Sequence, residues 1–141
     1  MPDARVLSPG RADAPALVLD EPLSFWGGVE TATGRVADVH HPRHGAVVTG
    51  RVLVMPAGRG SSSSSSVLAE TIRLGTGPAA IVLAEPDPIL ALGATVAHEL
   101  YGTAVPIVVV DASTFEAIRE GDRVRVDAVG ARADVEVRPG T

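Results

Sequence analysis

The fold is decided by residues 46–75, which read AVVTGRVLVMPAGRGSSSSSSVLAETIRLG. The first ten residues are mostly aliphatic and β-branched, which predicts a buried strand over 46–55 with a bend at Gly50. A glycine-rich turn and six serines follow, and apolar residues then recur with helical spacing over about 64–74. Gly75 is a suitable C-terminal stop. The segment therefore predicts a strand, a loop and a helix, with the serines at the junction.

The chain on either side of this segment alternates strands and helices. Short strands are expected over 4–7, 15–19 and 35–39, and further strands over 79–84 and 106–110. A helix is expected from Asp87-Pro88 to Gly102, and a short helix capped by Asp111 or Ser113 follows the strand over 106–110. The apolar side of the longer helix is expected to consist of Ile89, Leu90, Leu92, Val96, Ala97 and Leu100, and the chain is expected to end with a hairpin of 123–127 and 134–137. This order predicts an α/β fold with a partly parallel sheet. We expect one compact domain over residues 1–141.

The composition excludes several classes of function. The chain has a net charge of −5 and no basic stripe, which argues against nucleic acid as a partner. All 12 positive residues are arginine, so no lysine is present for a Schiff base or a phosphate-binding Walker loop. There is no cysteine, which excludes disulfides, thiolate nucleophiles and cysteine-ligated iron–sulfur clusters within this chain.

The absence of cysteine is also consistent with a cytoplasmic location, which we expect for this chain. Residues 1–5 are not followed by an apolar run, so we expect no signal peptide. No stretch approaches the roughly 20 apolar residues that a membrane helix needs.

The six serines have two possible interpretations, a flexible linker or a functional site. Composition alone is typical of a flexible linker. A linker separates two self-sufficient domains, however, and neither 1–57 nor 67–141 is large enough to be one comfortably. The position of the serines between a strand and a helix therefore favours a site.

The expected chemistry of this junction is the binding of an anion. The start of a helix presents unpaired backbone N–H groups and a partial positive charge. Gly58 and Gly60 let the backbone approach a ligand, and the guanidinium of Arg59 suits a carboxylate or phosphate. Ser61 and Ser62 add hydroxyl groups, and a hydroxyl held by the same N–H groups loses its proton more readily. The serines over 63–66 are expected to be caps or helix-surface residues.

The chain resembles the small subunit of aconitase X, a family that includes archaeal mevalonate 5-phosphate dehydratase and bacterial cis-3-hydroxy-L-proline dehydratase. The resemblance covers roughly residues 20–110. It rests on the order and spacing of Phe25-Trp26-Gly27-Gly28, Thr33-Gly34, His41-Pro42 with Gly45, Gly58-Arg59-Gly60-Ser61-Ser62-Ser63, and Gly77-Pro78-Ala79-Ala80.

This resemblance implies a swivelling β/β/α domain, equivalent to the mobile domain of aconitases. It implies a separate large subunit, forming a heterodimer, that carries an iron–sulfur cluster or a mononuclear iron. This chain is then expected to hold no metal and no cofactor. The implied reaction is the elimination of water from cis-3-hydroxy-L-proline or mevalonate 5-phosphate, with the metal of the partner assisting the leaving hydroxyl.

The resemblance also implies roles for residues of the serine run. Aconitase-type domains use a Gly-Ser-Ser-Arg stretch, in which a serine is the base and the arginine grips a substrate carboxylate. Gly60-Ser61-Ser62 matches the first three positions, so either Ser61 or Ser62 is expected to be the catalytic base. Ser63 stands where the pattern has arginine, and it stays open whether Arg59 replaces that arginine. Substrate-binding roles are expected for Arg59, Gly60, Ser63, Gly27 and Gly28.

Other readings remain open. His41 or His44 would carry the phosphoryl group if the chain were a phosphohistidine carrier of swivelling type, and His40 adds a third histidine to a possible metal site. The chain would be a non-catalytic binding domain if the serines were a linker. Trp26, the single tryptophan, is expected to be a core or interface anchor.

Overall fold

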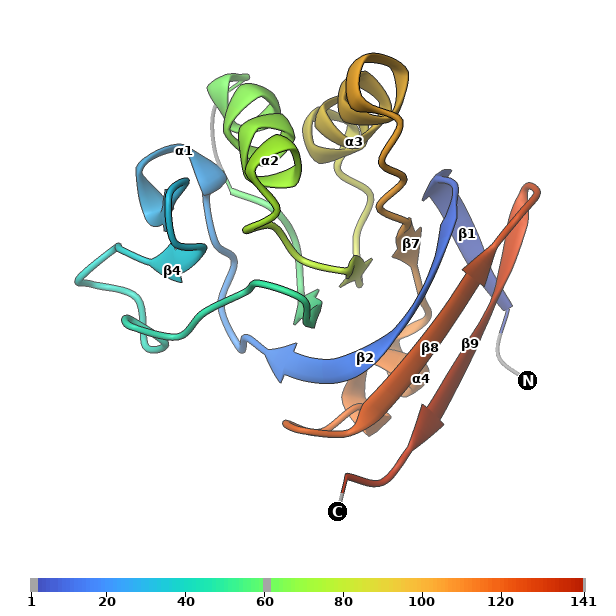
Figure 1. Cartoon of the computed structure of the whole chain (residues 1–141). Helices are drawn as coiled ribbons and strands as arrows, with labels where there is room; N and C mark the ends of the chain where they lie inside the picture. The colour runs from blue at the N-terminus through green and yellow to red at the C-terminus, as the bar shows by residue number, and fades with distance from the viewer. Residues whose placement is uncertain (1–2, 60–61, 141) are drawn as a thin grey trace.

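The computed structural model describes residues 3–59 and 62–140 of the chain (Figure 1). Its elements, in chain order, are β1 (Asp3–Ser8), β2 (Gly10–Val18), α1 (Phe25–Gly28), β3 (Val29–Glu30), β4 (Arg35–Val36), β5 (Val52–Met55), α2 (Ser63–Leu74), β6 (Ala80–Leu83), α3 (Pro88–Tyr101), β7 (Ile107–Val109), α4 (Ala112–Ala117), β8 (Arg123–Ala128) and β9 (Arg132–Arg138).

Seven of these strands form a closed barrel in the order β1-β7-β6-β5-β2-β8-β9, and β9 pairs with β1 to close it. The strands β2, β5, β6 and β7 run parallel to one another, and the remaining pairs are antiparallel. Strands β3 and β4 form a separate two-stranded ribbon. The expected partly parallel sheet is thus confirmed, and antiparallel closure turns it into a barrel.

The helices α2 and α3 are the crossover connections between the parallel strands and lie next to each other over one face of the sheet (Figure 1). Because side chains alternate along a strand, the parallel strands serve two cores. In β5, Leu53 and Met55 pack beneath α2 and α3, whereas Val52 and Val54 face the barrel interior. The β8–β9 hairpin covers that interior with Val124, Val126 and Val135, as its alternation predicts.

The predicted helix boundaries are confirmed where a local signal sets them. The Asp87 carboxylate accepts hydrogen bonds from the N–H groups of Ile89 and Leu90, at 2.9 and 3.1 Å, with Pro88 at the first helical position. Gly102 ends α3 with a φ of 73°, and Gly75 ends α2 with a φ of 76°, both in the left-handed region. At α4 the capping residue is Asp111, one of the two expected candidates.

The strand expected over 46–55 is correct only in its second half, since β5 begins at Val52. Before it, Val47 makes only an isolated antiparallel bridge with Arg35, the N–H of Val48 bonds to the carbonyl of Gly34, and residues 49–50 form a turn in which Gly50 has a φ of 67°. The strand expected over 35–39 is likewise reduced to β4. Val36 and Val48 join the core beneath the helices, whereas Val39 and Val47 are exposed, so a pattern of apolar residues alone does not require a strand here.

The face of α3 that packs inward also differs from the prediction. Its buried residues are Leu90, Gly93, Ala94 and Ala97, while Leu92, Val96 and Leu100 are exposed. The small side chains face inward because α3 approaches α2 closely. A Cβ on Gly93 would lie 2.6 Å from the carbonyl oxygen of Ser65.

No helix in the described part of the chain is long and apolar enough to cross a membrane.

Candidate functional site

The candidate site lies at the carboxyl ends of the parallel strands. After β2, the N–H of Leu19 bonds to the carbonyl of Val54 at 2.7 Å, and Leu23 forms a parallel bridge with Gly58. The chain after β2, the loop after β5 and the loop after β6 therefore meet at one edge of the sheet. Such an edge is a common location for a binding site in an α/β protein.

Gly58 lies against the carboxylate of Asp87. A Cβ at this position would collide with Oδ2 of Asp87 and would lie 3.2 Å from Cδ1 of Leu90. The other oxygen of the same carboxylate caps α3. The small size of Gly58 thus allows this contact with the start of α3, and its role in the approach of a ligand stays a prediction.

The serine run enters α2 as expected. Ser62 is the N-cap residue, with φ −58° and ψ −22°, and it is exposed. Its side chain makes no capping hydrogen bond, whereas its carbonyl oxygen accepts from the N–H and the Oγ of Ser65 at 3.2 and 2.8 Å. The Ser62 hydroxyl therefore lies at the mouth of the helix without being used to cap it, and its role as a base stays a prediction. Gly60 and Ser61 lie outside the described residues.

Two further predicted site residues flank this position. Ser63 is the first residue of α2 and is exposed. Arg59 is also exposed, and no ion pair of its guanidinium occurs within residues 3–59 and 62–140. Both side chains are accessible, and their roles in substrate binding stay predictions.

The predicted glycine pair lies in α1, a single distorted turn. Gly27 has a φ of 77° and is exposed, so only a residue without Cβ adopts this conformation easily. Gly28 is buried, and a Cβ there would lie 3.1 Å from the Leu23 side chain. Phe25 is fully buried, but Trp26 is 60% exposed. Trp26 is therefore not a core residue, which leaves an interface as the role expected for it.

Ser64 is the residue of this region whose importance was not predicted. It is only 3% exposed, and its Oγ lies 3.3 Å from the N of Trp26 and 3.3 Å from Oγ of Ser24. The expectation that it is a cap or a helix-surface residue is wrong. A signal was present in the spacing, because Ser64 precedes the buried Leu68 by one helical turn and lies on the same face of α2.

The histidines occupy a loop distant in sequence from the serines. His41 is 6% exposed, and its Nδ1 accepts from the N–H of Arg43 at 3.0 Å. Its Nε2 lies 3.3 Å from the carbonyl oxygen of Glu21, to which it donates. A ring with both nitrogens engaged is a structural residue and a poor phosphoryl carrier. In the described ranges, no three His, Cys, Asp or Glu residues come together as a potential metal site.

Glu120, on the turn before β8, forms an electrostatic cluster with two arginines. Its carboxylate accepts from Arg43 at 3.0 and 3.3 Å, from Arg51 at 2.9 Å and from the N–H of Val18 at 2.8 Å. Partial burial raises the pKa of Glu120, but these hydrogen bonds outweigh it and leave the pKa at about 2. The cluster ties the loop over 37–51 to the barrel and lies at the amino end of β5, so its role is structural.

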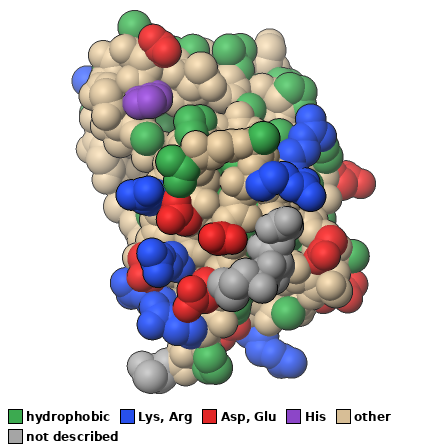
Figure 2. All heavy atoms as spheres, turned by 90° about the vertical axis from the view of Figure 1, so that its right-hand side faces the viewer, with side chains coloured by type: hydrophobic (Ala, Val, Ile, Leu, Met, Phe, Trp, Pro, Cys, Tyr) green, Lys and Arg blue, Asp and Glu red, His purple; other side chains and the backbone are tan. Residues whose placement is uncertain are grey.

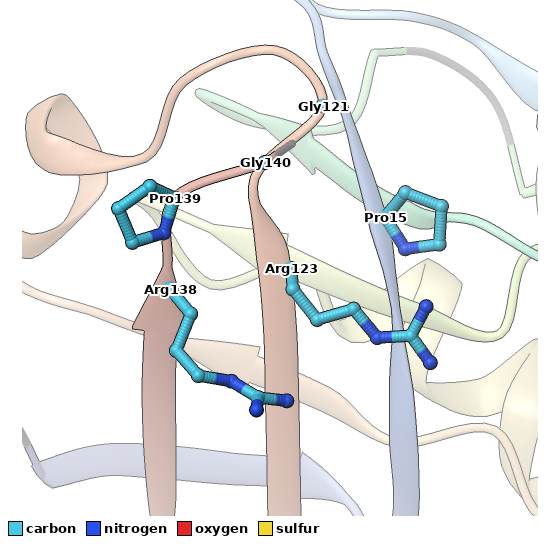
Figure 3. Close-up of a pocket in the computed structure, with 6 residues that line it drawn as sticks. All are labelled: Pro15, Gly121, Arg123, Arg138, Pro139 and Gly140. Carbon is cyan, nitrogen blue, oxygen red and sulfur yellow. The ribbon is translucent and has the colours of Figure 1, made fainter.

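The pocket in Figure 3 measures 530 Å³ and lies near the C-terminus, away from the start of α2. Its two arginines, Arg123 and Arg138, point the same way, and both approach Asp13, at 2.8 and 3.6 Å. Basic and acidic side chains are interspersed on this side of the molecule (Figure 2). With its positive charge already partly neutralised, this open pocket is a weaker candidate than the edge that carries the serines.

Comparison with known proteins finds similarity along nearly the whole chain. The family model of the aconitase X swivel domain matches residues 2–137. A crystal structure of Thermococcus kodakaraensis aconitase X in its holo-form is similar with a TM-score of 0.81 and 32% identity, over 96% of this chain and 99% of that one.

Two curated relatives differ in how they use such a domain. The cis-3-hydroxy-L-proline dehydratase of Pseudomonas aeruginosa is 52% identical over 73% of this chain, which spans only 18% of that enzyme. The phosphomevalonate dehydratase small subunit of Methanothermobacter thermautotrophicus is 47% identical over 67% of this chain and 72% of that subunit. The region is thus a minor part of one longer polypeptide and most of a separate subunit in the other.

Proposed function

The chain belongs to the aconitase X swivel-domain family, and from this membership we propose that it is the small subunit of a heteromeric dehydratase. The enzyme removes water from a small hydroxy acid, either cis-3-hydroxy-L-proline or mevalonate 5-phosphate. The observation that carries the proposal is the similarity to relatives with these two activities, over most of this chain.

The role of this chain in the reaction is to supply a base. One serine of the pair Ser61 and Ser62 accepts a proton from the carbon next to the activating group of the substrate. Support comes from the position of Ser62 at the start of α2, where its hydroxyl is exposed and does not cap the helix. The N–H groups of the first turn and the partial positive charge of the helix favour the alkoxide. Arg59 and Ser63 are the side chains available to orient the anionic group of the substrate.

The metal group of the family does not fit this chain. There is no cysteine to ligate an iron–sulfur cluster, and no cluster of three metal-binding side chains occurs among the residues that the structure describes. We therefore assign the iron centre to a large subunit, together with most contacts to the substrate. On this view the barrel is the equivalent of the mobile domain of aconitases and brings the serines to a site that the partner holds.

The test is reconstitution with the aconitase X large subunit of the source organism. We expect the isolated chain to be inactive and the co-purified complex to dehydrate one of the two substrates. In that complex, Ser61→Ala or Ser62→Ala is expected to lower kcat by a factor of about 10² or more, as for the loss of a general base.

Ser66→Ala is the matched control, because Ser66 is an exposed serine of the same run, one helical turn beyond Ser62. Full activity in both single variants and in the double variant would show that neither serine is the base. Activity with neither substrate would refute the proposed reaction.

A further inference from the structure

Trp26 is a large apolar side chain that the folded chain leaves in contact with water. It is 60% exposed, whereas its neighbour Phe25 is fully buried. A tryptophan side chain buries a large area when covered and is the residue type most enriched among the energetic anchors of interfaces. Its exposure beside α2 therefore indicates a surface that another molecule covers.

A closed ring of three hydrogen bonds holds Trp26 at this place. Ser24 Oγ donates to the carbonyl oxygen of Trp26 at 3.0 Å. A hydroxyl has one proton, so Ser24 accepts from Ser64 across the 3.3 Å between their Oγ atoms. The N–H of Trp26 donates in turn to Ser64 Oγ, at 3.3 Å. Each donor of the ring is used once, and Ser64 joins the Trp26 turn to the first turn of α2.

The turn needs this support because it is not a regular helix. Trp26 has φ −74° and ψ 115°, and Gly27 has φ 77° and ψ −14°, so neither residue has helical backbone angles, and the turn is closed by the bond from the N–H of Val29 to the carbonyl of Phe25. The N-cap position, Ser24, makes no capping hydrogen bond. The ring to α2 thus adds to the single backbone bond that closes the turn and satisfies the N–H and the carbonyl of Trp26.

We propose that Ser64 is a positioning residue, which together with Ser24 locks Trp26 to the first turn of α2 and presents it as the anchor on which the large subunit closes. The proposal rests on the proposed function and adds where the partner binds. The anchor is fixed to the helix that carries Ser62, so the contact that recruits the partner also sets the place of the serine.

The large subunit is favoured over a second copy of this chain as the molecule that covers Trp26. Ser62 and Arg59 are exposed beside α2, yet elimination of water needs a site from which solvent is excluded. The matched region makes up 18% of the Pseudomonas aeruginosa dehydratase, so in that relative a much larger polypeptide is available to cover this surface. A second copy would bring a second serine run rather than the missing part of the site.

Fluorine NMR tests the proposal directly. Trp26 is the one tryptophan of the chain, so 5-fluorotryptophan gives a single resonance that reports on this position alone. Addition of the unlabelled large subunit is expected to shift and broaden that resonance. Trp26→Ala is expected to raise the Kd for the large subunit about thirtyfold or more, as for an interface anchor.

Variants of the ring test the positioning role. Ser64→Ala and Ser24→Ala are each expected to change the fluorine resonance of the free chain and to raise the Kd for the large subunit about tenfold. Ser66→Ala is the control and is expected to change neither. A purely structural role predicts instead that Ser64→Ala lowers the Tm but leaves the resonance and the Kd unchanged.

The outcomes separate this proposal from the proposed function. An active complex in which the Trp26 resonance does not move, or in which Trp26→Ala binds with unchanged Kd, overturns the anchor alone. If the unmodified chain forms no complex with the large subunit, both proposals are wrong. A new resonance that grows with the concentration of the chain itself would identify a second copy as the occupant and overturn the assignment.

Discussion

Glu120 shows how one carboxylate fastens a long loop. Residues 37–51 contain no strand, and their connection to the barrel includes the contacts of Arg43 and Arg51 with Glu120 and with the carbonyls of Val18 and Ala16. The side chains of Arg43 and Arg51 are 34% and 28% exposed. A carboxylate shared between two arginines is worth more than an isolated surface pair, because neither cation is left without a counter-charge.

Glu120→Gln is expected to lower the free energy of unfolding at pH 7 by about 1 kcal/mol, a value discounted because solvent screens a partly exposed group. The pKa of Glu120 is about 2 in the folded chain, below its ordinary value of 4.5. The stability that Glu120 contributes is therefore present above about pH 4.5 and is lost as the pH falls towards 2. Urea unfolding of both proteins between pH 7 and pH 2.5 measures this difference.

Glu116→Gln is the matched control, since Glu116 is an exposed carboxylate on α4. We expect it to change the free energy of unfolding by less than about 0.5 kcal/mol at any pH. A gap between wild type and Glu120→Gln that stays constant down to pH 2.5 would contradict the role assigned to the ionised carboxylate.

Among the elements, the pair α2 and α3 is held closest where Gly93 meets Ser65. Replacement of a mid-helix glycine by alanine ordinarily stabilises a helix by about 1 kcal/mol. Here the new Cβ would lie 2.6 Å from a backbone carbonyl oxygen, which cannot rotate away. We expect Gly93→Ala to destabilise the protein by about 1 to 2 kcal/mol, although helix propensity alone would make this variant more stable. Thermal unfolding measures it.

Two variants of Thr95 measure the effect of helix propensity on stability without a steric clash, because Thr95 is exposed on the same helix. Thr95→Ala is expected to be more stable than Thr95→Gly by about 1 kcal/mol, which is the ordinary difference between alanine and glycine within a helix. A Gly93→Ala variant that is more stable than wild type would show that the two helices separate easily and that their spacing does not depend on Gly93.

The whole molecule has two cores that share their strands. One lies beneath α2 and α3, and the other fills the barrel. Since β5 sends alternate side chains into each, the cores are expected to unfold in one transition. Leu68→Ala in the first core and Val135→Ala in the second are expected to cost about 3 and 2 kcal/mol, and each to lower a single Tm.

Calorimetry decides this, because the calorimetric and van't Hoff enthalpies agree for a single transition. Leu100→Ala is the control for Leu68→Ala, since Leu100 is 68% exposed. Two resolved transitions, with only one displaced by each variant, would mean that the helical layer and the barrel are independent folding units.

Several features of this protein were determined by the sequence alone. The ends of α3 followed from Asp87-Pro88 and Gly102, and the β8–β9 hairpin followed from alternating valines, because capping and alternation act between near neighbours in the chain. The place of the serine run at the start of a helix was predicted in the same way. The absence of cysteine requires that any iron–sulfur cluster be ligated elsewhere, whatever the fold.

Which side chains are covered depends on contacts between segments that lie far apart in the chain. Ser64 is buried because the Trp26 turn lies on it, Trp26 is exposed because nothing in the described chain lies on it, and Gly58 is confined by Asp87. The inward face of α3 was set by the approach of Ser65 to Gly93, against the pattern of its larger apolar residues. Burial depends on segments that are distant in sequence, so a local pattern identifies an element but not the neighbour that will cover it.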